Sequence, residues 1–361
     1  MTLTRLHLTQ FRSWNRLELD ADDRPVAIHG PNGAGKTNIL EAVSMLAPGR
    51  GMRGALPGDQ ARKGPDVGWQ IRAGIGEYQV LTRALPGQPR EVLVDDKPST
   101  QIALGRLMRV IWLTPAMDRL WTDTPEQRRR FLDRVTLSFT PGHAEDALAY
   151  EKAMRERNRL LRDEVRDIGW YRALEAQMAE TGAAITRNRQ DAIARITAAQ
   201  DGVAQDGAGD SFPAARLTLL PGEGFADDPD PESIASRLAE TRSRDMAAGR
   251  TLTGPHRADL GAHWGPQDMP AALSSTGEQK ALLLSLILAN ARALSGENPV
   301  LLLDEVAAHL DADRRAALYD EITALKAQAF LTGTGPELFE TLQGRAQFLS
   351  VLREGATSHL A

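Results

Sequence analysis

Residues 30–37 read Gly30-Pro31-Asn32-Gly33-Ala34-Gly35-Lys36-Thr37 and fit the pattern G-x-x-x-x-G-K-[ST] of a P-loop. The glycines of such a loop let backbone N–H groups converge on phosphate oxygens. The apolar run 25–29 precedes the loop and predicts a strand, and residues 38–46 follow with helical spacing. A chance glycine-rich turn would not have both neighbours, so the sequence predicts a phosphate-binding loop between a strand and a helix.

The residues after the glycines complete a nucleotide site. Lys36 is expected to reach the β- and γ-phosphates of ATP, and the Thr37 hydroxyl to ligate Mg²⁺. The helix that starts here directs the positive end of its dipole toward the same anion. ATP and Mg²⁺ are therefore the expected cofactors, and the residues expected to bind ATP are Gly30, Pro31, Asn32, Gly33, Ala34, Gly35, Lys36, Thr37 and Asn38.

A second motif, Val300-Leu301-Leu302-Leu303-Asp304-Glu305, resembles a buried strand that ends in two acids. Alone, such a run is as often a plain buried strand with a solvated end. Beside a P-loop it predicts a Walker B motif, in which Asp304 holds the hydration shell of Mg²⁺ and Glu305 polarises the attacking water. The predicted catalytic residues are Lys36, Asp304 and Glu305, and the predicted metal ligands are Thr37 and Asp304.

The spacing of the two motifs indicates the class of P-loop protein. Lys36 and Asp304 lie 268 positions apart, a gap that favours an ABC-type head with a large insertion. Such heads carry a serine-glycine signature before Walker B, and residues 273–280 supply one with Ser275, Gly277 and Glu278. Ser275 and Gly277 are expected at the start of a helix, where N–H groups and a hydroxyl can bind the γ-phosphate of a nucleotide held by another subunit. The alternative is a plain capping box between Ser275 and Glu278.

The segment after Walker B leaves two roles open. Asp311 matches the D-loop of ABC-type heads and is equally a plausible N-cap of a helix over 312–327. Transporters usually carry a switch histidine after the next strand, where this chain has Thr332-Gly333-Thr334, so Thr332 or Thr334 is the expected substitute. The Q-loop residue is one of Gln60, Gln70 and Gln101, with nothing to choose among them.

Composition limits the remaining function classes. The chain has no cysteine, which excludes disulfides, thiolate metal sites and a thiol nucleophile. It has no signal peptide and no apolar stretch long enough to span a membrane, so a cytoplasmic protein is expected. The net charge of −5 divides into +3 for residues 128–195 and −8 for the remainder. A local basic region could therefore meet a nucleic acid despite the acidic average.

Residues 126–200 are rich in Ala, Arg, Glu and Leu, and predict two or three helices with a break near residues 167–169. An antiparallel helical hairpin is the simplest arrangement. Arginines recur three or four residues apart at 155, 159, 162 and 166, and a second group occupies 128–130. The proposed DNA contacts are Arg128, Arg129, Arg130, Arg155, Arg159 and Arg162, although a solvated helix surface is the alternative for any one of them.

Four segments together resemble the RecF family, bacterial recombination mediators related to SMC and ABC heads. The segment 8–14 is similar to the family's N-F-R-N-Y, and 33–42 matches its extended P-loop. The segment 125–133 matches P-x-x-R-R-x-F-L-D, and 253–260 matches G-P-H-R-D-D except that Ala258 replaces an acid. Walker B also departs from the family, which often has Asp-Asp where this chain has Asp304-Glu305. Transporters lack the last two segments, which are therefore the most specific.

The resemblance implies an α/β fold of the ABC/SMC type, with a head formed by residues 1–115 and 251–361 and a helical arm inserted at 116–250. It further implies an ATP-dependent homodimer that binds duplex DNA and gapped or single-strand/duplex junctions, with weak ATP hydrolysis resetting it. RecR and RecO are the implied partners in loading RecA during DNA replication, recombination, repair and the SOS response to damage. The alternatives are a nucleotide-binding subunit of an ABC transporter and an SMC-like DNA tether.

Overall fold

The computed structural model describes residues 1–62, 67–205, 212–222, 230–264, 268–325 and 327–361, which form two compact units. Unit 1 comprises Met1–Asp118, Val203–Pro213 and Leu283–Ala361, and unit 2 comprises Arg119–Gly202 and Ala214–Leu282. Strand β10 (Asp259–Trp264) pairs with β9 (Ala215–Leu220) inside unit 2. The head and arm bounds expected from the sequence stay a prediction.

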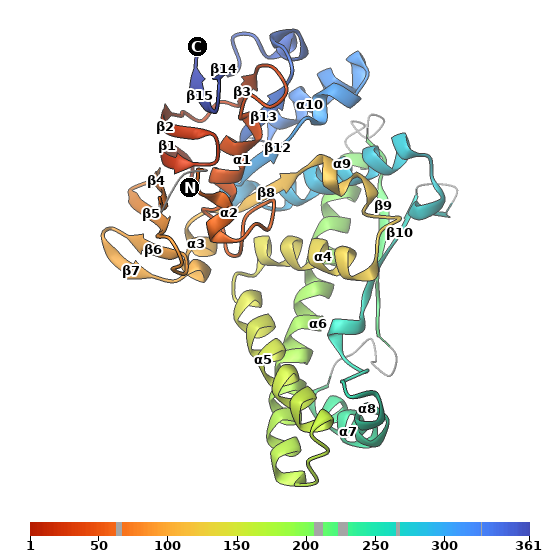
Figure 1. Ribbon diagram of the computed structural model, residues 1–361. Coiled ribbons are helices and arrows are strands. Elements are labelled where there is room, and N and C mark those ends of the chain that lie inside the picture. The colour runs from red at the N-terminus through yellow and green to blue at the C-terminus, as the bar shows by residue number, and fades with distance from the viewer. Residues whose placement is uncertain (63–66, 206–211, 223–229, 265–267, 326) are drawn as a thin grey trace. The chain divides into compact units, whose positions relative to one another are not determined.

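Unit 1 is built on one 12-stranded sheet to which both ends of the chain contribute (Figure 1). Its strands lie in the order β7-β6-β5-β4-β1-β2-β15-β14-β3-β13-β12-β8. Strands β14, β3, β13, β12 and β8 run parallel, and β15 joins the first and last segments of the chain by pairing with β2. The strand bounds are β1 Leu3–Phe11, β2 Trp14–Asp20, β3 Val26–His29, β4 Trp69–Ile75, β5 Tyr78–Ala84, β6 Glu91–Val94, β7 Lys97–Ser99, β8 Val110–Leu113, β12 Val300–Leu303, β13 Gln328–Gly333, β14 Gln347–Glu354 and β15 Thr357–Leu360.

The parallel strands form where the sequence has short continuous apolar runs. Every residue of β8, β12 and β13 is buried, as expected for parallel strands covered on both faces. Helix α1 (Lys36–Ser44) lies against β1 and β13. The other helices of this unit are α2 (Pro57–Gln60), α3 (Gln101–Leu107) and α10 (Ala312–Ala324), while α9 (Thr276–Ala293) passes from unit 2 into unit 1. The strands predicted before the P-loop and at Walker B are therefore confirmed.

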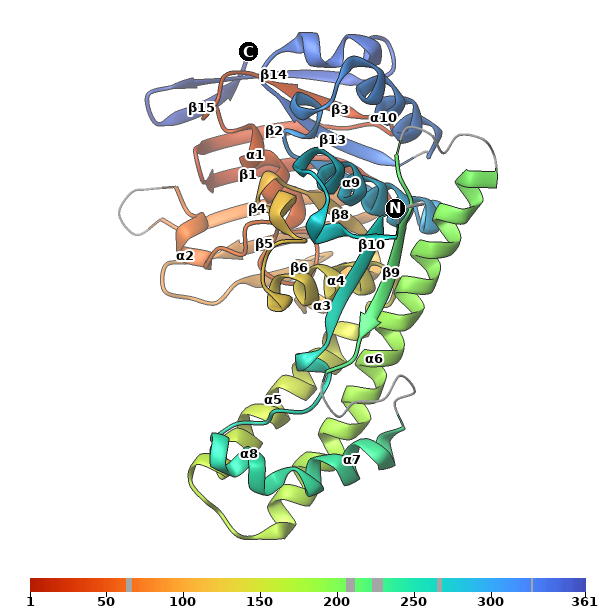
Figure 2. The same cartoon turned by 90° about the vertical axis from the view of Figure 1, so that its right-hand side faces the viewer.

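Unit 2 contains the predicted helices and a small sheet. Its helices are α4 (Pro125–Phe139), α5 (His143–Arg162), α6 (Ile168–Gln205), α7 (Pro231–Glu240) and α8 (Arg242–Ala248). Helices α5 and α6 lie side by side (Figures 1 and 2), and their apolar side chains share one core with α7. The antiparallel sheet β11-β10-β9 includes β11 (Met269–Pro270). Strand β9 was not predicted, although Ala215, Leu217 and Leu219 alternate with the exposed Arg216 and Thr218 and are less exposed than these.

A buried arginine on α5 joins that helix to α6, α7 and α8. The Arg157 side chain on α5 is fully buried and donates to Glu175 on α6 (3.1 Å) and to Asp245 on α8 (2.8 Å). It also donates to the Thr251 hydroxyl (2.8 Å) and the Leu238 carbonyl (2.9 Å). A buried charge is tolerated only when it is paired and hydrogen-bonded, and this one has four acceptors.

Replacing Arg157 with methionine is expected to loosen this part of unit 2, because Asp245 then stays buried without its cation. Removing one partner of a buried pair costs about 3–5 kcal/mol, which corresponds to amide exchange faster by roughly 100- to 1,000-fold or more in α5 and α8. Hydrogen–deuterium exchange measures it. Arg130→Met on α4, whose exposed pair with Glu126 is worth less than about 1 kcal/mol, is the control. Unchanged protection in Arg157→Met would contradict the stabilising role.

Among the described residues, none of the helices combines the length and apolarity that crossing a bilayer requires.

Candidate nucleotide-binding site

The P-loop connects the end of β3 to the start of α1 and passes tightly under β14 and β15. A Cβ atom at Gly30 would lie 2.1 Å from the Val351 carbonyl oxygen, and one at Gly35 would lie 2.4 Å from the Ser358 hydroxyl oxygen. Both positions also have positive φ angles, +150° and +109°. Glycine is therefore required at each end of the loop, while residues 31–33 at its tip are exposed.

Lys36 folds back over the loop that it follows. Its side chain is almost fully buried, and its ammonium group donates to the carbonyl oxygens of Gly30 (2.7 Å) and Pro31 (3.0 Å). Burial lowers the pKa of Lys36, and the carboxylates of Glu305 and Asp304 partly oppose that shift. A cation held out of water with only two carbonyl partners gains from an anion, so this geometry fits a phosphate group on the loop.

The ends of three parallel strands bring the two sequence motifs together. Strand β13 lies between β3 and β12, so their carboxyl ends meet at one edge of the sheet. There the Thr37 hydroxyl donates to the Asp304 carboxylate (2.9 Å) across 267 positions of sequence. The Thr332 hydroxyl at the end of β13 donates to the same oxygen (2.8 Å). Hydroxyl and carboxylate oxygens are the ligands that Mg²⁺ prefers, so Thr37 and Asp304 fit the predicted metal.

Of the two threonines considered for the switch position, only Thr332 belongs to this cluster in the described structure. The Thr332 hydroxyl accepts the Glu305 backbone N–H (2.9 Å) while it donates to Asp304, whereas Thr334 is exposed. Glu305 has a left-handed φ of +55° and a half-buried side chain. Thr332 thus fixes the backbone from which the Glu305 carboxylate projects.

The glutamines considered for the Q-loop lie elsewhere. The buried Gln60 donates to the Met45 sulfur (3.2 Å), Gln101 accepts from Arg90 (3.4 Å), and Gln70 lies within β4. Within the described ranges, none of the three has a contact with Thr37 or Asp304.

The signature residues form the capping box that was the alternative interpretation. The Ser275 N–H donates to the Glu278 carboxylate (2.7 Å), and the Glu278 N–H to the Ser275 hydroxyl (3.4 Å). These hydrogen bonds with Ser275 lower the pKa of Glu278. Ser275 and Gly277 are exposed, and Leu273 just before them is 73% exposed. The helix end is therefore capped and still presents an open, partly apolar surface.

Asp311 is the N-cap of α10, which is one of the two roles that the sequence left open for it. Its carboxylate accepts the Arg314 N–H (2.8 Å) and caps α10.

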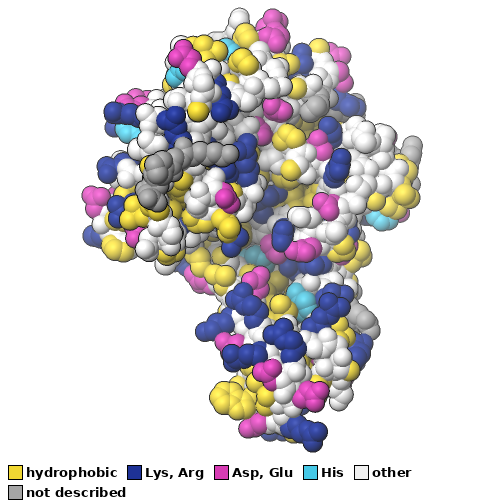
Figure 3. Space-filling view, in the orientation of Figure 1, with side chains coloured by type: hydrophobic (Ala, Val, Ile, Leu, Met, Phe, Trp, Pro, Cys, Tyr) yellow, Lys and Arg dark blue, Asp and Glu magenta, His cyan; other side chains and the backbone are white. Residues whose placement is uncertain are grey.

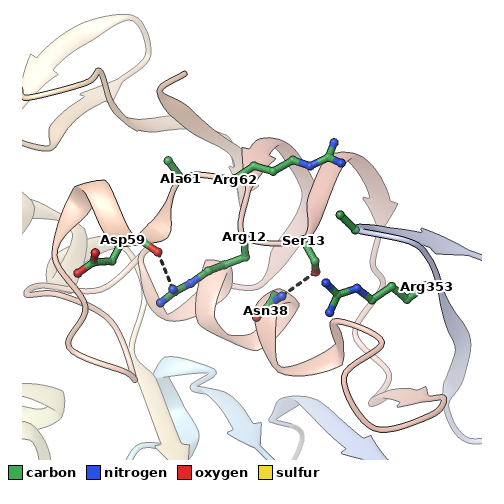
Figure 4. A pocket seen from close by; sticks show the side chains of 8 residues that line it. Arg12, Ser13, Asn38, Asp59, Ala61, Arg62 and Arg353 are labelled. Carbon is green, nitrogen blue, oxygen red and sulfur yellow. Dashed lines mark hydrogen bonds between the residues drawn. The ribbon is translucent and has the colours of Figure 1, made fainter. Parts of the chain in front are cut away.

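A pocket beside the P-loop contains three arginines that sequence reasoning did not assign to the site. It has a volume of about 300 Å³ and is lined by Arg12, Ser13, Asn38, Asp59, Ala61, Arg62, Arg353 and Ala356. Figure 4 shows the guanidinium groups of Arg12 and Arg353 on either side of the hydrogen-bonded pair Ser13–Asn38 (2.7 Å). Arg353 donates to the Gly33 carbonyl at the loop tip (3.0 Å). The only sequence signal was the resemblance of residues 8–14 to a family segment.

Arg12 is oriented by a buried acid. Its guanidinium donates to both carboxylate oxygens of Glu41 (2.5 and 2.8 Å), and Glu41, fully buried on α1, also accepts Arg53 (3.2 Å). The pocket thus presents guanidinium groups beside the P-loop.

The two groups of arm arginines differ in their surroundings. Arg128 makes a bidentate pair with Asp259 (2.8 and 2.7 Å), Arg129 donates to the Ala258 carbonyl (2.7 Å), and Arg130 pairs with Glu126. By contrast, exposed side chains on α5 form no ion pair with a described residue. These are Arg155, Arg159 and Arg162. Figure 3 shows Lys and Arg side chains gathered over this helix.

The two most specific family segments, 125–133 and 253–260, meet in unit 2. Besides the contacts of Arg128 and Arg129, Arg189 pairs with Asp133 (2.7 Å) and donates to the Pro255 carbonyl (2.7 Å). Burial raises the pKa of Asp133, but hydrogen bonds from His143 and Arg189 outweigh it and bring that pKa to about 2. Ala258 contributes its backbone oxygen, so the absence of the family's acid leaves the Arg129 contact intact.

His256 belongs to the same cluster as a neutral residue. Burial lowers its pKa to about 4. The ring accepts the Tyr150 hydroxyl at Nδ1 (2.8 Å) and donates from Nε2 to the Thr251 carbonyl (3.2 Å). Both nitrogens are occupied, which gives the histidine a structural role at the start of the returning segment.

Comparison with known proteins supports the fold assignment. A family model described as "AAA domain" matches residues 5–62. The chain is 47% identical over 365 residues to "DNA replication and repair protein RecF" of Mesorhizobium japonicum, covering 97% of this chain and 96% of that protein. It is 45% identical over 386 residues to the protein of the same name from Caulobacter vibrioides, covering 99% and 98%.

Solved structures agree with this fold at low sequence identity. One is described as "Structure of the recombination mediator protein RecF-ATPrS in RecFOR pathway"; it matches with a TM-score of 0.84 at 20% identity, covering 99% of this chain and 98% of that chain. Another, an "SmcHead bound to the C-winged helix domain of ScpA", matches with a TM-score of 0.58 at 14% identity, covering 100% and 97%. The predicted α/β fold of the ABC/SMC P-loop type is confirmed.

Proposed function

This chain belongs to the RecF family of DNA replication and repair proteins, and we propose that it is an ATP-dependent DNA-binding recombination mediator. The observation that carries the proposal is the Thr37–Asp304 contact, which joins a P-loop and a Walker B strand from opposite ends of the chain. That contact supports a single ATP site in the head. We propose that the head comprises residues 1–115 and 251–361, and that the arm, residues 116–250, is inserted between these two parts.

In this proposal the nucleotide phosphates lie on the loop 30–38 against Lys36. Mg²⁺, when bound by Thr37 and Asp304, neutralises phosphate charge. Glu305 orients and deprotonates the attacking water, and Thr332 holds the backbone that positions it. The cationic pocket with Arg12 and Arg353 accommodates the remaining part of ATP.

Nucleotide binding is proposed to control dimerisation. Ser275 and Gly277 of one subunit contact the γ-phosphate held by the other, while Glu278 of the same signature caps the helix start. Asp311 lies near the shared surface in this proposal. The exposed start of α9 supports such a surface, because it leaves Ser275 and Gly277 accessible to a second subunit. ATP then links two subunits only in the closed state, and slow hydrolysis releases them.

We further propose that the closed dimer binds duplex DNA and gapped or single-strand/duplex junctions in the cytoplasm. It works there with RecR and RecO to load RecA in replication, recombination, repair and the SOS response. The DNA contacts are assigned to Arg155, Arg159 and Arg162, because Arg128 and Arg129 are engaged inside unit 2 and Arg130 is paired on its own helix.

A charge-removal experiment tests the DNA contact. With ATP present, wild type is expected to bind gapped duplex DNA, and the triple variant Arg155→Gln/Arg159→Gln/Arg162→Gln to bind it more weakly. Its slope of log affinity against log salt should fall by roughly 2–3, since each lost phosphate contact removes about 0.9. Fluorescence anisotropy at several salt concentrations measures both quantities.

The matched control removes the same charge from exposed, acid-paired arginines of unit 1, as Arg5→Gln/Arg16→Gln/Arg24→Gln. If both triple variants lost the same affinity for DNA, the loss would reflect net charge alone. If the α5 variant bound DNA like wild type, α5 would not be the DNA-binding helix.

A further inference from the structure

The start of α6, directly after its connection to α5, exposes large apolar side chains. We define the arm tip as residues 163–172, in which Trp170 is 64% exposed and Ile168 is 52% exposed. The next residue, Tyr171, is only 1% exposed. Neighbouring residues on a helix point about 100° apart, so the first turn of α6 buries Tyr171 and turns Trp170 outward.

The arm tip is held in a defined conformation. Helix α5 ends at Arg162, and two residues later Glu164 has a left-handed φ of +49°. The Val165 N–H then donates to the Leu160 carbonyl (3.0 Å). This is the pattern of a Schellman cap. On the α6 side, the Arg242 guanidinium lies 5.0 Å from the centre of the Tyr171 ring and pairs with Glu175 (2.6 Å). Trp170 is therefore presented to solvent from an anchored turn.

A row of cations on α5 leads to this tip. Lys152, Arg155, Arg159 and Arg162 lie three or four residues apart on one face and span about 15 Å at 1.5 Å per residue. All four are exposed, and none pairs with an acid within the described part of the chain. Of the acids at the tip, Asp167 accepts the Gly169 N–H (2.8 Å). The helix thus offers a track for phosphates that leads into the arm tip, the segment that carries Trp170.

The size of the apolar surface decides between two kinds of partner. A stable protein interface buries about 800 Å² on each side, whereas one exposed tryptophan and one isoleucine offer roughly 200–300 Å². A single base stacked on an aromatic ring needs only that much. Charge complementarity with the cation row favours a nucleic acid as well.

We infer that Trp170 stacks on an unpaired base where a duplex held along α5 gives way to a single strand. This inference rests on the proposed DNA-binding function of the arm and names the feature of the DNA that the arm tip reads.

Two probes test it in the full-length protein with ATP: a blunt duplex, and the same duplex with a single-stranded overhang whose first unpaired base is 2-aminopurine. Wild type is expected to bind the overhang probe more tightly and to quench its fluorescence. Trp170→Ala should weaken overhang binding by roughly 5- to 150-fold, the range that one stacked base contributes, with blunt-duplex binding unchanged. Trp170→Phe should keep most of the affinity, and Leu85→Ala, an exposed apolar site in unit 1, should match wild type.

If Trp170→Ala bound and quenched the overhang probe like wild type, the inference would be overturned. The exposed apolar side chains of the arm tip would then be assigned to contact with a protein partner. Equal losses on both probes would also overturn the inference. If wild type bound neither probe with ATP, the proposed function would fail together with the inference. Binding of both probes with no role for Trp170 would remove the inference alone.

Discussion

Lys36→Ala is expected to abolish ATP binding and, with it, nucleotide-dependent dimerisation. The substitution removes the buried cation that faces the loop carbonyls of Gly30 and Pro31. Truncating one side of a buried charge pair costs about 2–5 kcal/mol, or roughly 30- to 5,000-fold in affinity. Titration with a fluorescent ATP analogue measures the loss, and sedimentation velocity measures the dimer.

Two further variants separate charge from position. Lys36→Arg keeps the positive charge and is expected to retain binding while losing hydrolysis, since the longer planar group cannot occupy the same place. Lys97→Ala removes an exposed lysine of unit 1 and should match wild type. Nucleotide-dependent dimers of Lys36→Ala would show that the site lies elsewhere.

Glu305→Gln is expected to separate hydrolysis from binding. Glutamine retains the shape of the side chain and cannot act as a base, so turnover should fall by about 100- to 10,000-fold. ATP affinity should stay close to wild type, because the phosphates are assigned to the loop 30–38 and not to Glu305. Phosphate release and nucleotide titration measure the two quantities, with the exposed Glu340→Gln as control. Unchanged turnover would exclude Glu305 as the general base.

The central contact of the site could be predicted because local signals determine it. A P-loop needs a strand before it and a helix after it, and Walker B is a short apolar run. Parallel strands place their carboxyl ends at one edge of a sheet, so Thr37 and Asp304 were expected to meet. The pocket with Arg12, Arg62 and Arg353 could not be derived in this way, since it depends on the pairing of β15 with β2 across nearly the whole chain.

The arm arginines show another limit of local reasoning. Arg155 and Arg157 lie two residues apart on one helix, yet Arg155 is exposed and Arg157 is fully buried among Glu175 and Asp245. Arg128 likewise faces Asp259, a partner 131 positions away. Helical spacing predicts which residues share a face of the helix. Which face is buried depends on packing against segments distant in sequence.

ATP is proposed to close a dimer by contacting the signature of the opposite subunit. Sedimentation velocity of Glu305→Gln with saturating ATP and Mg²⁺ tests this most directly, because blocked hydrolysis lets the closed state accumulate. Ser275→Arg in the same background adds a large cation at the exposed signature and leaves every residue of the P-loop unchanged. We expect dimers of Glu305→Gln and ATP-bound monomers of the double variant. Monomers of Glu305→Gln, or dimers that Ser275→Arg leaves intact, would contradict the account.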